Sequence, residues 1–166
     1  LKQELEQAKE AANKDTLTKL FNRRHFDQKL ASILNSQNNA HSSALILIDV
    51  DHFKAFNDNY GHLMGDVVLK SIGQVLIHMC ENTDHVPYRY GGEEFVILLS
   101  SCSPANAKNV LEKQRIRFNK RKFADVAITA STGISNIEII DKKTTINQLF
   151  KQADEAVYNA KESGRN

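Results

Sequence analysis

Apolar residues recur along this chain with two different periods, and each period predicts one kind of secondary structure. A period near 3.6 residues places Phe26, Leu30 and Ile33 on one face of a segment that Asn22 can cap. The same period recurs over residues 65–80 and 145–161, and further helical segments are expected at residues 105–120 and, over a shorter length, at residues 53–57. These segments are predicted to be the helices of the domain.

Shorter apolar runs without helical spacing predict the strands. Ala44–Asp49 is a continuous apolar run that ends at an acid, as expected for a central strand buried on both faces. Val86–Tyr90 and Glu93–Leu99 flank Gly91-Gly92, and two glycines between strand-like runs predict a hairpin with a type I′ or II′ turn. A last strand is expected over Val126–Ile134.

The order of these elements predicts the fold class. Helix, strand, helices, hairpin, helix, strand and helix follow one another, and the hairpin makes at least one strand pair antiparallel. A doubly wound parallel sheet is therefore excluded. We expect an α+β fold with a ferredoxin-like, palm-type, mostly antiparallel central sheet surrounded by helices.

The first 14 residues differ in character from the rest of the chain. They are polar and rich in helix formers, and Leu1, Leu5, Ala8 and Ala12 follow the 4-3-4 spacing of a coiled-coil seam. A solvated helical tail is the alternative. We interpret residues 1–14 as a helical linker from an upstream regulatory region, in a piece of a longer protein, and residues 15–166 as one domain.

Composition narrows the class of protein. The chain has 166 residues, 41% of them hydrophobic, which suits one globular core, and its net charge of +2 requires no polyanionic partner. Cys80 and Cys102 lack metal-binding spacing and are interpreted as reduced thiols, although one disulfide is the alternative. We expect neither a membrane span of roughly 20 apolar residues nor a signal peptide.

Acidic residues stand at the ends of the predicted strands. Asp49 ends one strand, Asp51 follows it, and Glu93 and Glu94 lie at the hairpin. If the two elements pair, Asp49 and Glu93 converge at one edge of the sheet, where clustered carboxylates need a neutralising cation. Oxygen donors without nearby Cys or His pairs favour Mg²⁺ or Mn²⁺. Solvated surface acids are the alternative.

The segment after the first strand has the residue types of a nucleotide site. Lys54 can meet phosphate charge, and the backbone N–H groups of Phe53 and Lys54 can bind an anion at a helix start. Asn57 and Asp66 together match the donors and acceptors of a guanine edge, and His62 lies between them. The alternatives are a turn residue for Asn57, a helix cap for Asp66 and a structural hydrogen-bonding role for His62.

Basic residues occur in two further places. Lys161 and Arg165 are four residues apart, so a continued helix places them on one face as a phosphate clamp, or as cations favoured by the helix dipole. Residues 113–123 are also basic, and we interpret them as a solvated helix face, because the two phenylalanines in this stretch look like core residues and other base-stacking aromatic residues are lacking. No nucleic-acid partner is expected.

Four stretches together resemble one known family. The sequence RYGGEEF (Arg89–Phe95) resembles the signature of the GGDEF family in its GGEEF variant. DTLTKLFNRR (Asp15–Arg24), DVDHFKAFNDNYGHLMGD (Asp49–Asp66) and ADEAVYNAKESGRN (Ala153–Asn166) are similar to its other motifs and occur in the family's order. The resemblance implies a diguanylate cyclase, which condenses two GTP molecules into cyclic di-GMP and releases two pyrophosphates.

The resemblance also implies roles for individual residues. Two Mg²⁺ or Mn²⁺ ions per GTP would be held by the side chains of Asp49, Glu93 and Glu94 and by the backbone carbonyl of Val50. Glu93 would activate the 3′-hydroxyl, and Lys54 would stabilise charge in the transition state. Substrate binding is implied for Phe53, Lys54, Asn57, His62, Asp66, Lys161 and Arg165.

Because the product contains two nucleotides and each domain holds one GTP, the resemblance implies a homodimer. The upstream sensor would set the pairing through the linker. The domain is expected to be cytoplasmic, without direct membrane contact, even if the full protein is anchored. A catalytically inactive module that binds GTP or cyclic di-GMP, and a pure dimerisation scaffold, are the alternatives.

One departure from the family pattern concerns product inhibition. Many members carry an Arg-x-x-Asp inhibitory site before the signature, and here Asn82 and His85 occupy those positions. Asn82 cannot make the bidentate contacts of a guanidinium group. We therefore expect no inhibitory site of that kind.

Overall fold

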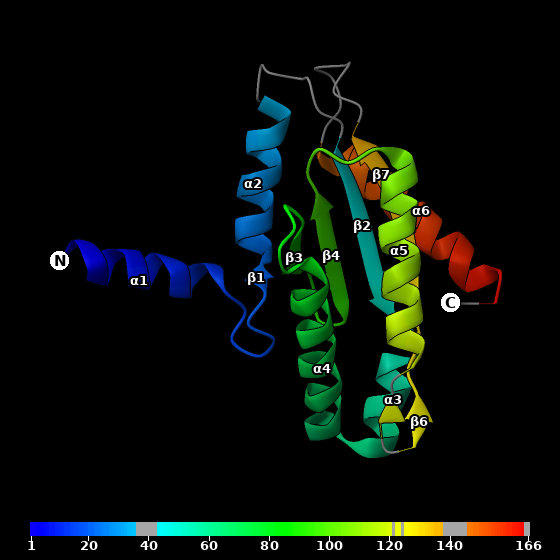
Figure 1. Cartoon of the computed structure of the whole chain (residues 1–166). Helices are drawn as coiled ribbons and strands as arrows, with labels where there is room; N and C mark the ends of the chain where they lie inside the picture. The colour runs from blue at the N-terminus through cyan, green and yellow to red at the C-terminus, as the bar shows by residue number, and fades with distance from the viewer. Residues whose placement is uncertain (36–42, 121, 124, 138–145, 165–166) are drawn as a thin grey trace.

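A mixed five-stranded sheet forms the centre of the described structure (Figure 1). This computed structural model describes residues 1–35, 43–120, 122–123, 125–137 and 146–164. The strand order is β1-β3-β4-β2-β7, and only β1 and β3 pair in parallel. The strands are β1 (Phe21–Asn22), β2 (Ser43–Val50), β3 (Val86–Arg89), β4 (Glu94–Leu99) and β7 (Ala130–Ile137).

Helices cover both faces of this sheet, as Figure 1 shows. They are α1 (Lys2–Asn13), α2 (Arg23–Asn35), α3 (Phe53–Tyr60), α4 (His62–Cys80), α5 (Pro104–Asn119) and α6 (Ile146–Glu162), and a small hairpin of β5 (Lys122–Phe123) and β6 (Val126–Ala127) follows α5. Ile46 and Ile48 face the core under α3, α4 and α5, whereas Leu45 and Leu47 face the core under α2 and α6. The predicted α+β, palm-type architecture is therefore confirmed.

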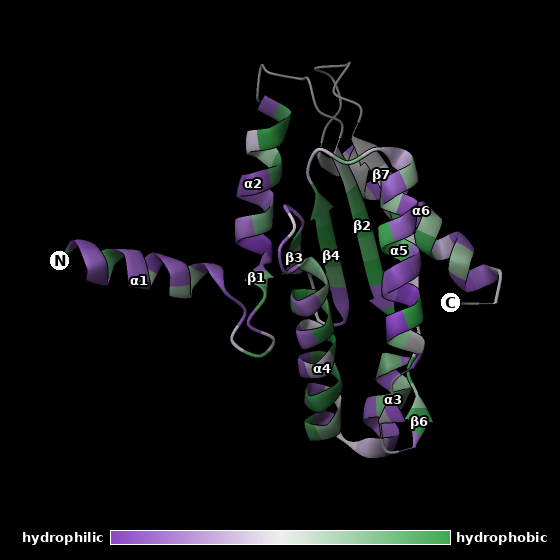
Figure 2. Cartoon of the chain, viewed as in Figure 1, coloured by the Kyte–Doolittle hydropathy of each residue, from purple (hydrophilic) through white to green (hydrophobic). Residues whose placement is uncertain are grey.

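The central strand follows its prediction closely. β2 is buried along nearly its whole length and pairs with β4 on one side and with β7 on the other. Figure 2 shows β2 and β4 as the most hydrophobic ribbons of the sheet. A strand that is covered on both faces has no solvent side, so its apolar run is continuous rather than alternating.

The hairpin is present, but its predicted turn type is wrong. β3 and β4 are joined by residues 90–93, and the N–H groups of Tyr90 and Gly91 both donate to the Glu94 carbonyl, at 2.8 and 3.1 Å. Neither Gly91 nor Gly92 has positive φ, which type I′ and II′ turns require. The longer loop reverses the chain without left-handed residues. The Glu94 carboxylate occupies the space beside Gly91, so a Cβ there would displace that carboxylate.

Two other boundaries differ from the predictions. α4 begins at His62 rather than near Gly65, so Asp66 lies within the helix and is not its cap; Gly61 caps it with φ 85°. The strand expected over Val126–Ile134 is divided between β6 and β7. The β2–β7 ladder ends at Val50, which pairs with Ala130. Beyond it, the N–H of Asp51 donates to the Thr129 carbonyl at 2.9 Å.

Other local expectations are confirmed. Asn22 caps α2, because its Oδ1 accepts from the His25 N–H at 3.1 Å. Cys80 and Cys102 are both buried, and the structure shows no disulfide between them. The expectation that no segment resembles a membrane span differs from the structure at α4, which is long and apolar enough for one. Its apolar residues Val68, Ile72 and Leu76 pack in the core.

α1 projects away from the body of the domain (Figure 1), and none of its residues is buried. Leu5 is 57% exposed. The predicted helix is confirmed, and its Leu and Ala positions remain free to meet another helix.

An arginine ties the opening loop of the domain to the hairpin. Arg89 donates from Nη1 to both carboxylate oxygens of Asp15, at 3.1 and 3.2 Å, and from Nε and Nη2 to the carbonyls of Gly91 and Gly92. Asp15 also accepts from the N–H and hydroxyl of Thr18, at 2.8 and 2.7 Å. Burial tends to raise the pKa of Asp15, but the bonds from Thr18 and Arg89 outweigh it and lower that pKa. The hairpin loop is thus held through a residue 74 positions earlier in the sequence than Arg89.

Replacing this arginine tests its structural role. Arg89→Lys keeps the charge but loses the planar fork that serves three acceptors at once. We expect the free energy of unfolding in urea to fall by about 1–3 kcal/mol, because the pair is largely buried. Arg115→Lys, in the exposed Arg115–Glu112 pair, is the control and should leave stability unchanged. Equal effects of the two substitutions would contradict the assigned role.

A buried amide on α5 provides a second test of the packing. Gln114 is fully buried, and neither Oε1 nor Nε2 has a hydrogen-bond partner in the described part of the chain. Gln114→Met preserves the approximate volume and removes that desolvation cost, so we expect unfolding to require about 1–2 kcal/mol more free energy. The exposed Gln74→Met serves as the control in the same thermal and urea measurements. A less stable Gln114→Met protein would show that the amide is satisfied in solution.

Candidate functional site

The carboxylates of the candidate site meet where β2 ends and β4 begins. Asp49 lies opposite Glu94 in the antiparallel ladder, and the N–H of Val50 donates to the Glu93 carbonyl at 3.2 Å. Asp49 and Val50 are therefore fixed beside the hairpin loop by backbone hydrogen bonds. The expected convergence of β2 and the hairpin at one edge of the sheet is present.

A lysine from the other end of the chain reaches this edge. Nζ of Lys161, near the end of α6, lies 2.6 Å from Oδ1 of Asp49. The two side chains are 30% and 17% exposed, so the pair is partly shielded from water. Because α6 packs across β7 and β2, two residues separated by 112 positions form one ion pair. The amino-acid pattern marked both residues but did not predict that they pair.

The local electrostatics favour protonation or a cation. Burial, and then the charge of Asp49, raise the pKa of Glu93, while Lys161 opposes the shift. Burial also raises the pKa of Glu94, followed by the charges of Asp49, Asp154 and Glu93, while Arg23 opposes that shift. Asp154 on α6 and Arg23 on α2 had no predicted role at this site, because only packing brings them here. This edge therefore carries more negative than positive charge.

The donor set at this edge suits a divalent cation, although it is not assembled around one. Among the described residues, no three His, Cys, Asp or Glu side chains form a ready metal cluster. The ammonium of Lys161 already neutralises Asp49, which shows that this carboxylate accepts a cation in this position. Carboxylate and carbonyl oxygens are the ligands that Mg²⁺ and Mn²⁺ prefer. The residues present therefore fit such an ion if Lys161 moves aside.

Asp51 has a different environment from Asp49. It is 4% exposed and accepts hydrogen bonds from the hydroxyls of Thr129 and Ser131, at 2.7 and 2.6 Å. These bonds join the end of β2 to the start of β7. Asp51 therefore serves the fold rather than the carboxylate cluster.

The start of α3 supplies free backbone donors next to this edge. α3 begins at Phe53, two residues after Asp51, and its N-cap His52 is left-handed with φ 55° and no capping side-chain bond. The first N–H groups of a helix have no partner within the helix, so those of Phe53 and Lys54 are available to an anion. Phe53 is buried and anchors the turn, while Lys54 is exposed. His52 was not singled out by sequence, because left-handed backbone is uncommon for residues other than glycine.

The side chain of Asn57 packs against α4 in the space beside Gly65. A Cβ on Gly65 would overlap Oδ1 of Asn57. That oxygen is buried and has no hydrogen-bond partner among the described residues. Asp66 follows Gly65 and is half-buried, whereas His62 is exposed at the start of α4. The junction of α3 and α4 thus gathers the amide and the carboxylate that the sequence singled out.

The candidate residues accordingly form two neighbouring groups. One group lies at the β2–β4 edge and consists of Asp49, Val50, Glu93, Glu94 and Lys161. The other lies on α3 and the first turns of α4, which follow β2, and consists of Phe53, Lys54, Asn57, His62 and Asp66. Arg165 lies outside the described residues. Asn82 is exposed with φ 59°, after the end of α4, and His85 is half-buried before β3.

Comparisons with known proteins match this chain to one family over nearly its whole length. The family model described as "Diguanylate cyclase, GGDEF domain" matches residues 12–166. The chain is 36% identical to diguanylate cyclase VdcA of Vibrio cholerae and 35% identical to response regulator PleD of Caulobacter vibrioides. All of this chain is covered in both comparisons, but only 49% and 37% of those relatives. The chain spans about half or less of their length.

Solved structures share the fold. The coiled coil and GGDEF domain of DgcB from Caulobacter crescentus, solved in complex with c-di-GMP, matches with a TM-score of 0.88 and 28% identity, over 99% of this chain and 88% of that one. Diguanylate cyclase SiaD from Pseudomonas aeruginosa, solved with its activator SiaC, matches with a TM-score of 0.85 and 34% identity, over 98% of this chain and 64% of that one. The chain therefore belongs to the GGDEF family of diguanylate cyclase domains.

Proposed function

We propose that this domain condenses two GTP molecules into cyclic di-GMP, with release of two pyrophosphates. The observation that carries the proposal is the carboxylate edge itself, where Asp49, Glu93 and Glu94 lie beside Lys161. Clustered carboxylates with raised pKa values are costly for a fold, and such clusters occur at functional sites. The membership of the family supplies the substrate class.

The same edge would hold two Mg²⁺ or Mn²⁺ ions per GTP, through Asp49, Glu93, Glu94 and the carbonyl of Val50. Such ions, when bound, neutralise phosphate charge and make a hydroxyl more acidic. In the present structure Lys161 covers Asp49, so its ammonium must leave that carboxylate. The triphosphate offers it a new anionic partner. Lys161 thereby changes from a counterion of the protein to a ligand of the substrate.

The nucleotide would lie between the two groups of residues. Asn57 and Asp66 would read the guanine edge, with His62 beside it. The N–H groups of Phe53 and Lys54, together with the Lys54 ammonium, would hold phosphate oxygens. Lys54 can also stabilise the charge that develops at the reacting phosphorus. Arg165 would add a second cation to Lys161 at the phosphates.

The reaction needs a proton acceptor next to the attacking hydroxyl. The 3′-oxygen of one GTP forms a bond to the α-phosphorus of the other as the bond to pyrophosphate breaks, and the hydroxyl proton passes to Glu93. A carboxylate whose pKa is raised holds a transferred proton more readily. Such a displacement depends on alignment and charge neutralisation rather than covalent help. A second, equivalent step closes the ring.

A second copy of the domain would be the main partner. Each α-phosphorus must face the 3′-hydroxyl of the other nucleotide, so two domains meet with their sites opposed. Residues 1–14 would be the linker to an upstream sensor, and residues 15–166 the catalytic domain. The exposed α1 supports a coiled coil between two copies. We place the domain in the cytoplasm, without a nucleic-acid partner or direct membrane contact.

A catalytically inactive module that binds GTP or cyclic di-GMP is the second candidate, favoured by the DgcB domain having been solved with c-di-GMP. A dimerisation scaffold is the third. Incubating the protein with GTP and Mg²⁺ distinguishes them, since the three give turnover, binding alone or neither.

Glu93→Gln tests the assigned proton acceptor. The amide has nearly the same shape but cannot accept the proton, so we expect turnover to be abolished while GTP affinity stays within about one order of magnitude. Product formation is measured by chromatography, and GTP affinity by calorimetry. The surface substitution Glu81→Gln is the control and should leave turnover unchanged. Turnover that survives Glu93→Gln would remove Glu93 from this role.

The dimer requirement predicts how the rate depends on protein concentration. Below the dimer dissociation constant, we expect initial velocity to rise with the square of protein concentration, because two domains must meet. Leu5→Glu should weaken the pairing of α1, so that the same initial velocity requires a higher protein concentration. Gln7→Glu is the control and should leave the dependence of velocity on concentration unchanged. First-order dependence down to nanomolar protein would contradict a catalytic dimer.

A further inference from the structure

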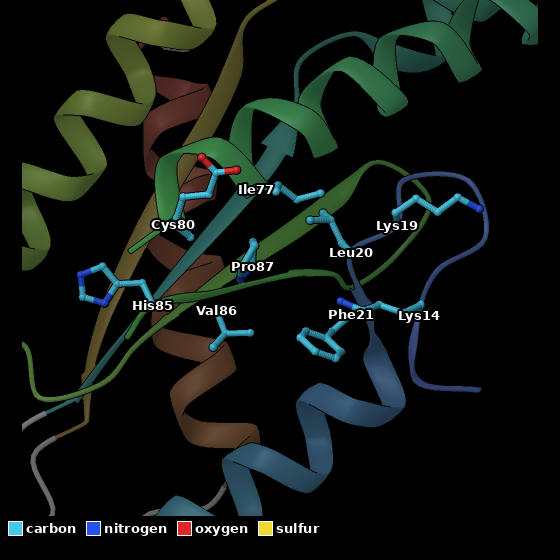
Figure 3. Close-up of a pocket in the computed structure, with 10 residues that line it drawn as sticks. Lys14, Lys19, Leu20, Phe21, Ile77, Cys80, His85, Val86 and Pro87 are labelled. Carbon is cyan, nitrogen blue, oxygen red and sulfur yellow. The ribbon is translucent and has the colours of Figure 1, made fainter. Parts of the chain in front are cut away.

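A pocket of about 290 Å³ lies on the β1–β3 side of the sheet, away from the carboxylate edge (Figure 3). It opens where the loop before β1 meets the end of α4 and the start of β3. Phe21, Ile77, Val86 and Pro87 supply apolar surface from three elements that are distant in sequence. Its volume is near the lower end of the range for small-molecule sites.

One wall of this pocket is cationic. The ammonium of Lys14 lies 3.4 Å from the centroid of the Phe21 ring, and burial lowers the pKa of Lys14, with Glu10 opposing the shift. Lys19 stands at the rim, and its side chain points outward in Figure 3. Neither lysine forms a salt bridge within the described residues, whereas Glu81, the acid in the lining, lies 3.1 Å from His78.

We propose that this pocket binds a small amphipathic anion, in which one compact apolar group carries a single carboxylate, sulfonate or phosphate. The apolar group packs on Phe21, Ile77 and Pro87, and the anion meets the Lys14 ammonium. A partly desolvated ammonium beside an apolar surface is stabilised more strongly, in free energy, by an anionic ligand than by water. The two lysines of the lining favour an anion over a cation, and the single lysine at the ring favours one anionic group.

Binding at this place would act on the loop that supports the hairpin. The loop is closed by the Asp15 N–H donating to the Leu20 carbonyl at 2.7 Å and the Lys19 N–H donating to the Asp15 carbonyl at 3.0 Å. Asp15 in turn holds Arg89. A ligand against Lys14 and Phe21 therefore stabilises the segment from which the Gly91-Gly92 loop is held. This effect on stability does not depend on the proposed cyclase activity.

Titration with 1-anilinonaphthalene-8-sulfonate tests the proposal on the whole chain. We expect one saturable fluorescent site and a raised melting temperature. Ile77→Asp should weaken binding at least about tenfold, and Lys14→Met about fivefold. Ile116→Asp on α5 is the matched control, since Ile116 is 44% exposed and Ile77 37%, and it should leave affinity unchanged. Thermal melting without probe verifies that each variant is folded.

Competition identifies the ligand class. Octanoate should displace the probe, whereas 1-octanol at the same concentration should do so several-fold less, because it lacks the anion. Cyclic di-GMP should not displace it, because it has no compact apolar group and Asn82 and His85 replace the family's Arg and Asp. Equal losses for Ile77→Asp and Ile116→Asp, or equal displacement by octanoate and octanol, would overturn the proposal. Displacement by cyclic di-GMP would instead make this a nucleotide site.

Discussion

The pairing of β2 with β4 forces carboxylates together, and much of the domain is arranged around that constraint. The register that sets Asp49 opposite Glu94 also brings Glu93 to the N–H of Val50. Burial, and after it the charge of Asp49, raise the pKa values of both glutamates. A fold keeps such an edge only if cations from elsewhere compensate it, and Lys161 on α6 and Arg23 on α2 do so here. The two helices that cover one face of the sheet thus also neutralise its edge.

Rigidity at this edge comes from interactions that lie outside it. Arg89 fixes the carbonyls of Gly91 and Gly92 and is itself held by Asp15, at the start of the domain. Asp51 ties β2 to β7 through two hydroxyls. Gly65 leaves the space that Asn57 occupies. The contacts of Arg89 and Asp51 limit the freedom of backbone segments, and the space beside Gly65 accommodates Asn57. A site for phosphoryl chemistry needs such order before the substrate arrives.

The two sides of the sheet differ in chemistry. The β2–β4 edge gathers negative charge, whereas the pocket beside β1 and β3 combines an apolar floor with lysine. The loop from Lys14 to Phe21 links the two regions. It lines the pocket, and it also carries Asp15, which accepts a hydrogen bond from Arg89 beside the hairpin. One hydrogen-bonded loop therefore connects the pocket with the hairpin.

Sequence alone determined those features that depend on neighbouring residues. The 3.6-residue period located the helices, the uninterrupted run before Asp49 marked a strand covered on both faces, and Asn22 was recognised as a cap. The four motifs indicated the family and singled out the candidate residues. Tertiary structure decided the remainder, because hydrogen bonds and charges act between segments that are distant along the chain. The loop type at Gly91-Gly92, the left-handed His52, the Arg89–Asp15 pair and the placement of Lys161 on Asp49 all follow from packing rather than from local pattern.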